Sequence, residues 1–180
     1  MPMTAPKVAH KTMGGPMADD PPQMGPEIDL RIEDQDWVAE RSEPELLTII
    51  ETALGAAASH ARAGRVDLLL TSDAEMQVLN RTWRDRDKPT DVLSFPSDDD
   101  AFETGFLGDI ALGYGVMTAD ATSMSKSFNA HFSHLLIHGY LHLLGFDHQE
   151  PGEAEEMETL ETKILAELGY SDPYSMSETQ

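Results

Sequence analysis

The sequence predicts an α+β fold in a single domain. Four short segments have the alternating or continuous apolar patterns of β-strands, and five longer segments have apolar residues at helical spacing. The helical segments dominate the C-terminal half of the chain. With 180 residues, of which 40% are hydrophobic, the chain is long enough for one real core.

The four predicted strands differ in their patterns. Residues 28–32 alternate apolar and charged side chains, which is typical of a half-buried strand, whereas residues 66–70 indicate a buried one. Residues 92–95 and residues 107–112 indicate two further strands. The acidic segment between them, residues 97–103, is expected to be a loop.

The predicted helices have recognisable ends. Pro44 opens a helix that ends near Gly64. Ser72 and Glu75 indicate a capping box at the start of a helix that runs through Trp83. The other three helices are expected at residues 116–124, 129–144 and 151–168.

We expect a domain of residues 28–170 between two tails. Residues 1–27 hold six of the eleven prolines and five of the ten methionines, which indicates a disordered N-terminal tail. Residues 171–180 are polar and rich in turn-forming residues, which indicates a flexible C-terminal tail.

The composition excludes several classes of function. A formal net charge of −21 argues against a general nucleic-acid binder and against an anionic membrane surface, because both need Lys and Arg. The absence of cysteine limits metal ligands to His and carboxylate groups. No segment resembles a signal peptide or a membrane span, so we expect a cytoplasmic protein without a membrane partner.

Five of the seven histidines lie between positions 131 and 148. Four of them share one stripe of the predicted helix, within an arc of about 80°: His131, His134, His138 and His142. Taken singly, His131 and His134 are each expected to be satisfied core or surface residues.

The segment from His138 to His148 has the spacing of a metal site. His138 and His142 are four residues apart, so both imidazoles lie on one helical face, with Cβ atoms about 6 Å apart. Gly145 can end the helix in a left-handed turn, and His148 can then return to the same ion. Three neutral nitrogen ligands with an open fourth position are typical of catalytic zinc. We therefore predict one Zn²⁺ per chain on these three histidines.

The same spacing occurs in metzincin proteases, which carry Glu directly after the first His as their general base. Here that position is Gly139. A zinc peptidase would lack its proton acceptor, so peptidase activity is only a minor alternative.

Residues 81–88 contain four of the twelve basic residues. They are Arg81, Arg84, Arg86 and Lys88. These side chains could be solvated charges that complement the C-terminal dipole of a helix. They could equally form a local phosphate-binding patch on an acidic protein.

Two motifs together resemble the YbeY family of rRNA-maturation endoribonucleases. They are residues 80–96, which include Pro-Thr-Asp-Val-Leu-Ser-Phe-Pro, and residues 138–148. The Gly-Asp-Ile segment at 108–110 and the ending at 168–174 also fit. The resemblance covers about residues 28–174 and leaves out the N-terminal tail.

The resemblance implies an α+β fold with a small mixed sheet of about four strands packed against helices. It implies zinc on His138, His142 and His148, a functional arginine at Arg84, and cleavage of single-stranded RNA. The implied role is 16S rRNA 3′-end maturation and late 70S ribosome quality control. The implied partners are rRNA and the ribosome, with ribosomal proteins or an assembly GTPase as further candidates and no DNA.

Bound zinc can lower the pKa of a water ligand to about 7 and polarise a phosphoryl oxygen. Arg84 would stabilise the charge that develops on the phosphoryl group. The sequence does not identify a general base. The metal-bound hydroxide, a carboxylate such as Asp85 or Asp147, and the RNA 2′-hydroxyl all remain candidates.

An alternative from a different class is a ribosome-assembly factor that binds rRNA or ribosomal proteins and uses the metal mainly for stability. The acidic composition partly supports it, because ribosomal proteins and assembly GTPases often present basic surfaces.

Overall fold

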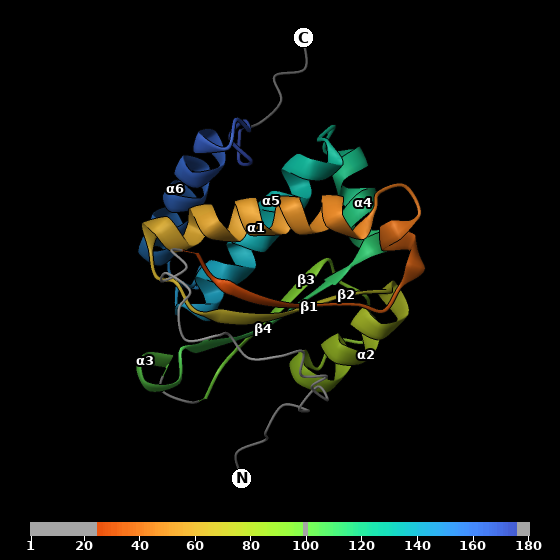
Figure 1. The fold of residues 1–180 in the computed structure, drawn as a ribbon, viewed down its shortest axis with the longest axis horizontal. Helices are drawn as coiled ribbons and strands as arrows, with labels where there is room; N and C mark the ends of the chain where they lie inside the picture. Colours follow the sequence, from red (N-terminus) through yellow and green to blue (C-terminus); the bar gives the residue numbers. More distant parts are fainter. Residues whose placement is uncertain (1–24, 99–100, 176–180) are drawn as a thin grey trace, which may run out of the picture.

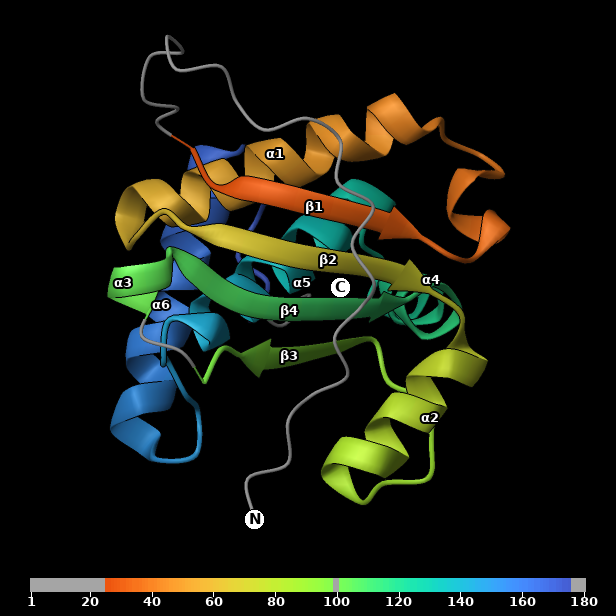
Figure 2. The same ribbon diagram turned by 60° about the horizontal axis from the view of Figure 1, so that its bottom comes forward.

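The computed structural model describes residues 25–98 and 101–175. Four strands of this part of the chain form one mixed sheet in the order β1-β2-β4-β3. The strands are β1 (Glu27–Ile32), β2 (Arg65–Thr71), β3 (Val92–Pro96) and β4 (Phe106–Gly113). β1, β2 and β4 are parallel, and β3 pairs antiparallel with β4 at one edge (Figure 2). All four predicted strands are present, and the predicted α+β class is confirmed.

The five predicted helices are also present. They are α1 (Glu43–His60), α2 (Asp73–Arg84), α4 (Tyr114–Ser123), α5 (Phe128–Leu143) and α6 (Pro151–Glu167). Two short helices were not predicted: η1 (Gln35–Val38), and α3 (Ala101–Thr104), which lies in the segment expected to be a loop. Each has only four residues, too few for a helical period to appear in the apolar pattern.

Side chains cap the helices that lead into and out of the sheet. Ser72 Oγ accepts a hydrogen bond from Glu75 N at 3.3 Å, so Ser72 caps α2, and this bond is one half of the predicted capping box. At the start of α1, Ser42 N donates to Glu45 Oε2 at 2.7 Å within a capping box. These bonds satisfy backbone donors that the first helical turn leaves free.

The helices cover the two faces of the sheet unequally. α1, α5 and α6 lie on one face and α2 lies on the other (Figure 1). α5 packs against β3, β4, α1, α4 and α6, and most of its side chains are buried. α5 is therefore the central helix of the main core, and it carries the histidine stripe.

Gly139 lets α5 lie close to the sheet. A Cβ at this position would lie 3.1 Å from Ser94 Oγ on β3 and 3.2 Å from Ile110 Cγ2 on β4. Ser94 Oγ also donates a hydrogen bond to the Gly139 carbonyl oxygen at 3.1 Å. Because interiors are close-packed, a larger side chain at position 139 would push α5 away from both strands.

The predicted tails fall largely outside the described residues, which begin at position 25 and end at position 175. β1 already starts at Glu27, the last residue assigned to the N-terminal tail.

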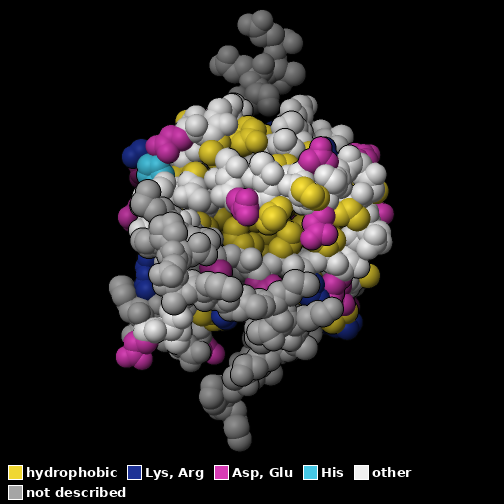
Figure 3. All heavy atoms as spheres, viewed as in Figure 1, with side chains coloured by type: hydrophobic (Ala, Val, Ile, Leu, Met, Phe, Trp, Pro, Cys, Tyr) yellow, Lys and Arg dark blue, Asp and Glu magenta, His cyan; other side chains and the backbone are white. Residues whose placement is uncertain are grey.

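The face that carries α1 shows acidic and apolar side chains with few basic ones (Figure 3). Among the helices of residues 25–98 and 101–175, none combines the length and apolarity needed to cross a bilayer.

Gly139→Ala tests the close approach of α5 to the sheet. We expect a net loss of about 1–2 kcal/mol in the free energy of unfolding, because overpacking outweighs the gain in helix propensity. Gly55→Ala in α1 is the matched control, since an added Cβ there meets nothing within 4 Å. That control should gain up to about 1 kcal/mol. Urea unfolding measures both, and equal stabilisation of the two variants would contradict the close packing.

Candidate metal centre

His138, His142 and His148 lie together at the C-terminal end of α5. The Nε2 atoms of His138 and His142 are 3.0 Å apart. The His148 ring centroid lies 5.7 Å from that of His138 and 5.0 Å from that of His142. Each residue offers one ring nitrogen, and these nitrogens all lie within 4.8 Å of one another. The structure thus brings together the three histidines that the spacing singled out.

A reversal of the chain after α5 carries His148 back to the helix. Gly145 has a φ of +92°, the left-handed conformation that glycine adopts without strain. Gly145 N donates to the His142 carbonyl oxygen at 3.0 Å, and Phe146 N donates to the Leu141 carbonyl oxygen at 3.1 Å. This pair of bonds is a Schellman motif, which ends the helix where the sequence predicted.

Hydrogen bonds determine where the two facing imidazoles carry their protons. His142 Nδ1 donates to the Phe146 carbonyl oxygen at 2.9 Å, an atom that can only accept. His138 Nδ1 donates to Glu161 Oε1 at 2.6 Å. In the neutral rings both Nε2 atoms are therefore unprotonated, and their lone pairs face each other.

Two facing lone pairs repel unless a cation lies between them. A tetrahedral zinc ion with bonds of 2.0–2.1 Å holds its nitrogen ligands about 3.3 Å apart. The separation of 3.0 Å between His138 Nε2 and His142 Nε2 is close to that value. The three histidines therefore fit a metal ion.

Glu161 on α6 orients the His138 ring through its Nδ1 atom. Its side chain is fully buried, and besides the bond from His138 it accepts hydrogen bonds from His134 Nε2 at 3.1 Å and from the Tyr174 hydroxyl. Burial alone raises the pKa of the Glu161 carboxyl. The hydrogen bonds from His134, His138 and Tyr174 outweigh burial and lower that pKa to about 2. Glu161 is therefore an ionised acceptor that fixes the orientation of the His138 ring.

Sequence reasoning did not identify Glu161. On α6 it lies on the buried stripe with Met157, Ile164 and Leu165. A carboxylate within an apolar stripe is a signal that it has a buried partner, because unpaired Glu is almost never fully buried. That signal does not name the partner, which comes from a different helix.

His142 is held in its neutral form. Burial lowers the pKa of His142, and the nearby His138 and His148 lower it further. The bond to the Phe146 carbonyl oxygen and the charge of Asp147 oppose these effects without overcoming them. A neutral imidazole is the form that binds a metal ion.

Arg84 lies on a different element and does not join the three histidines directly. Its Nη2 donates to the Ser94 carbonyl oxygen at 3.0 Å, and its guanidinium carbon lies 5.5 Å from the centroid of the Phe95 ring. Ser94 in turn bonds to Gly139, the neighbour of His138. Arg84 is thus connected to the metal-binding helix through β3.

The position after the first histidine is crowded for a glutamate side chain. The Cβ of any residue at position 139 would already crowd Ser94 and Ile110. The structure therefore gives a packing reason why the metzincin base is missing, and the same contact bears against the peptidase alternative.

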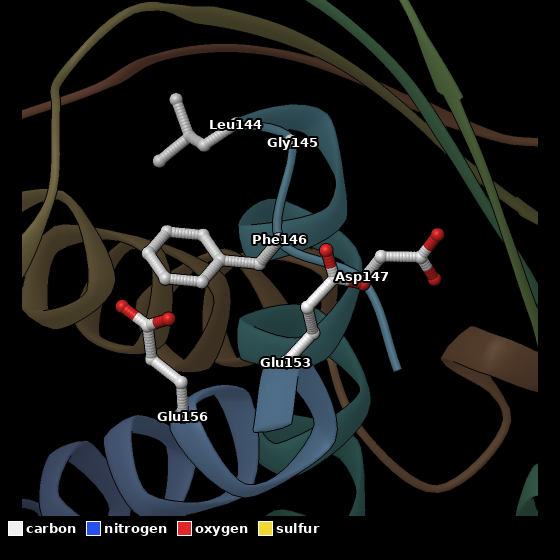
Figure 4. A pocket seen from close by; sticks show the side chains of 6 residues that line it. All are labelled: Leu144, Gly145, Phe146, Asp147, Glu153 and Glu156. Atoms are coloured by element: carbon white, nitrogen blue, oxygen red, sulfur yellow. The ribbon is translucent and has the colours of Figure 1, made fainter. Parts of the chain in front are cut away.

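A pocket of about 240 Å³ lies beside the loop that follows α5 (Figure 4). It is lined by Leu144, Gly145, Phe146, Asp147, Glu153 and Glu156. Because three of these side chains are carboxylates, the pocket favours a basic group over a phosphate.

The two remaining histidines of the stripe differ from each other. His134 bonds to Glu161 and lies 3.3 Å from the Tyr174 hydroxyl oxygen, so it is satisfied, as expected. His131 is buried, but neither of its ring nitrogens has a hydrogen-bond partner among the described residues. The expectation that His131 is a satisfied residue was therefore wrong.

Comparisons with known proteins agree on one family. The family described as Endoribonuclease YbeY matches residues 31–169. A protein named endoribonuclease YbeY from Rhizobium etli is 44% identical, covering 82% of this chain and 92% of that protein. One of the same name from Bradyrhizobium sp. is 46% identical, covering 75% and 86%, and one from Beijerinckia indica is 47% identical, covering 84% and 78%.

A structural comparison agrees with the fold. A Thermotoga maritima protein solved in solution matches with a TM-score of 0.50 and 23% identity, over 83% of this chain and 99% of the other. The family match spans most of the chain, and it includes both motifs on which the resemblance was based. The chain therefore belongs to the YbeY endoribonuclease family.

Proposed function

We propose that this protein is a zinc-dependent endoribonuclease that cuts single-stranded RNA. The observation that carries the proposal is the pair of unprotonated Nε2 atoms of His138 and His142, which face each other with His148 beside them. Three protein nitrogens with room for a fourth ligand are typical of catalytic zinc. The relatives are named as endoribonucleases, which supports RNA as the substrate.

Zinc bound by His138, His142 and His148 would supply a Lewis acid for the phosphodiester group and lower the pKa of water. The protein keeps the ligands ready for it, because Glu161 and the Phe146 carbonyl hold the two Nδ1 protons. This arrangement leaves the Nε2 lone pairs of the neutral rings free to bind the ion.

Of the two carboxylates considered as general bases, we favour Asp147. Asp147 directly precedes His148, and its Oδ1 accepts a hydrogen bond from His148 N at 2.7 Å. Asp85 lies instead at the end of α2, in a left-handed conformation with a φ of 55°. Mapping the RNA termini tests the route: a cyclic phosphate would mean that the RNA 2′-hydroxyl attacks, and a 5′-phosphate would mean that water does.

Arg84 is the residue proposed to stabilise charge on the phosphoryl oxygens. Among the described residues, no carboxylate oxygen lies within ion-pair distance of its guanidinium, whereas Arg81 lies 3.6 Å from Asp87. An unpaired guanidinium held by β3 provides local positive charge on a chain with a net charge of −21. That local positive charge would let an otherwise acidic protein contact the phosphates of RNA.

The proposed biological role is 16S rRNA 3′-end maturation and late 70S ribosome quality control in the cytoplasm. It rests on the family resemblance of residues 80–96 and 138–148. Incubation of the purified protein with ribosomes that carry unprocessed 16S rRNA, followed by mapping of the 3′ end, tests this role. No change in the 3′ end with intact ribosomes would contradict it.

A second candidate function is an assembly factor that binds a ribosomal protein or an assembly GTPase. The pocket lined by Asp147, Glu153 and Glu156 favours it, since this surface suits a basic partner. Complementation separates the two functions. A variant without metal that still restores rRNA processing in cells would favour the assembly factor over the nuclease.

His142→Ala should lose both bound zinc and RNA cleavage, because it removes the central nitrogen ligand. His60→Ala is the matched control, as His60 lies on α1 and bonds to Glu167. Elemental analysis of zinc per chain and cleavage of a labelled single-stranded RNA measure the two effects. If the His142 variant keeps one zinc, the ligand assignment is wrong; if both variants cut like the wild type, the activity does not come from this site.

Arg84→Ala should keep its zinc and lose about 10²-fold or more in the rate of RNA cleavage, the typical effect of removing one donor that stabilises developing charge. Arg31→Ala is the control, because Arg31 lies on β1, at the opposite edge of the sheet from β3. Unchanged cleavage by the Arg84 variant would mean that the basic segment only complements the helix dipole.

Glu161→Gln should weaken zinc binding by about 10–100-fold, because the carboxylate that orients His138 becomes a neutral amide. Glu155→Gln on the exposed side of α6 is the control and should leave the affinity unchanged. Competition with a chromophoric chelator measures both dissociation constants. Equal affinities would show that His138 needs no support from α6.

A further inference from the structure

His131 is a buried polar side chain without a partner. It lies on α5, seven residues before His138, and only 4% of its surface is exposed. Neither Nδ1 nor Nε2 has a hydrogen-bond partner among the described residues. Leaving a buried polar group unsatisfied typically costs about 1–3 kcal/mol, so an unpaired buried imidazole calls for an explanation.

Two carboxylates converge on this imidazole from other elements. Asp91 immediately precedes β3, and Asp120 lies on α4. One ligand atom of each lies within 4.8 Å of one ring nitrogen of His131 and of the other carboxylate. Both aspartates are partly buried.

Neither carboxylate is neutralised by a neighbouring cation. Among the described residues, no Lys or Arg nitrogen forms an ion pair with Asp91 or Asp120. Asp91 Oδ1 accepts hydrogen bonds from Val92 N at 2.8 Å and Thr90 Oγ1 at 3.2 Å, which hold that carboxylate in place. Lys126, whose charge acts on His131, donates instead to the Pro173 carbonyl oxygen at 2.7 Å.

We propose that Asp91, Asp120 and His131 form a second metal site, which binds a divalent cation that accepts both nitrogen and oxygen ligands, such as Zn²⁺ or Mn²⁺. One imidazole and two carboxylates are a common donor set for such ions. The ion would bind one of the two unpartnered ring nitrogens of His131 and neutralise two carboxylates that otherwise repel each other. The three ligands come from separate parts of the fold and include a buried, unpartnered imidazole, which distinguishes this site from a cluster of surface carboxylates.

The second site is separate from the three-histidine site. The ring centroids of His131 and His134 are 6.3 Å apart, and those of His134 and His138 are 6.2 Å apart. The intervening His134 is occupied by Glu161 and Tyr174. The two sites therefore share no ligand, and the proposal does not depend on the nuclease function.

A cation at this site would link the start of β3 to α4 and α5. Asp91 ends the segment that connects α2 with β3, and that segment carries Arg86 and Lys88. Binding of the cation should therefore stabilise the fold and restrain the basic segment near Arg84. These consequences go beyond the role of zinc at the three-histidine site.

Equilibrium dialysis of the full-length protein against excess Zn²⁺, with zinc per chain measured at equilibrium, tests the second site. The wild type should bind two equivalents, and Asp120→Asn and His131→Phe should each bind one. Glu51→Gln, which removes an exposed carboxylate from α1, should still bind two. His131→Phe fills the same buried space with an apolar ring, so it tests the site even if Asp120→Asn does not fold.

The proposal is overturned if Asp120→Asn and His131→Phe both bind as many equivalents as the wild type, whether that number is one or two. Survival in both variants would mean that the extra zinc binds elsewhere on the acidic surface. His142→Ala separates this result from the nuclease proposal. If only the three-histidine assignment fails, the wild type and His142→Ala bind one equivalent and Asp120→Asn binds none.

Discussion

The close contact between α5 and the sheet at Gly139 is the constraint on which the site depends. Because this residue has no side chain, the helix lies against Ser94 and Ile110 and buries most of its surface. The same contact turns the stripe with His138 and His142 toward α6 and the following loop. It also bonds the helix to the strand that holds Arg84. Packing, metal geometry and the placement of the arginine thus share one cause.

α6 supplies the carboxylate of Glu161 that orients a histidine of α5. A fully buried carboxylate is costly unless it is paired, and Glu161 is paired with two histidines and a tyrosine. In return, its charge fixes the ring of His138 and leaves the metal-binding nitrogen free. The stability of the α5–α6 contact and the geometry of the metal site are therefore coupled.

The local charge around Arg84 differs in sign from the net charge of the chain. The chain is strongly acidic, yet the guanidinium of Arg84 has no carboxylate partner among the described residues and is held by a backbone carbonyl. Near α5, the Glu161 carboxylate is paired with histidines, whereas Asp91 and Asp120 are grouped around His131. Carboxylate placement along this one helix would determine where cations bind and where phosphate can approach.

The sequence by itself determined the α+β class, the five longer helices and the three-histidine motif. These features depend on short-range periodicity: residues four apart on a helix share a face, and Gly145 ends that helix through local backbone geometry. It did not predict η1 and α3, because single turns leave no period. Only the tertiary structure decided that Glu161 supports His138, that Ser94 and Ile110 crowd position 139, and that His131 meets Asp91 and Asp120. His138 and Glu161 are 23 positions apart, and Ser94 and Gly139 are 45 apart. Asp91 and Asp120 lie 40 and 11 positions before His131 and outside its helix. These contacts follow from how the helices pack on the sheet rather than from any local pattern.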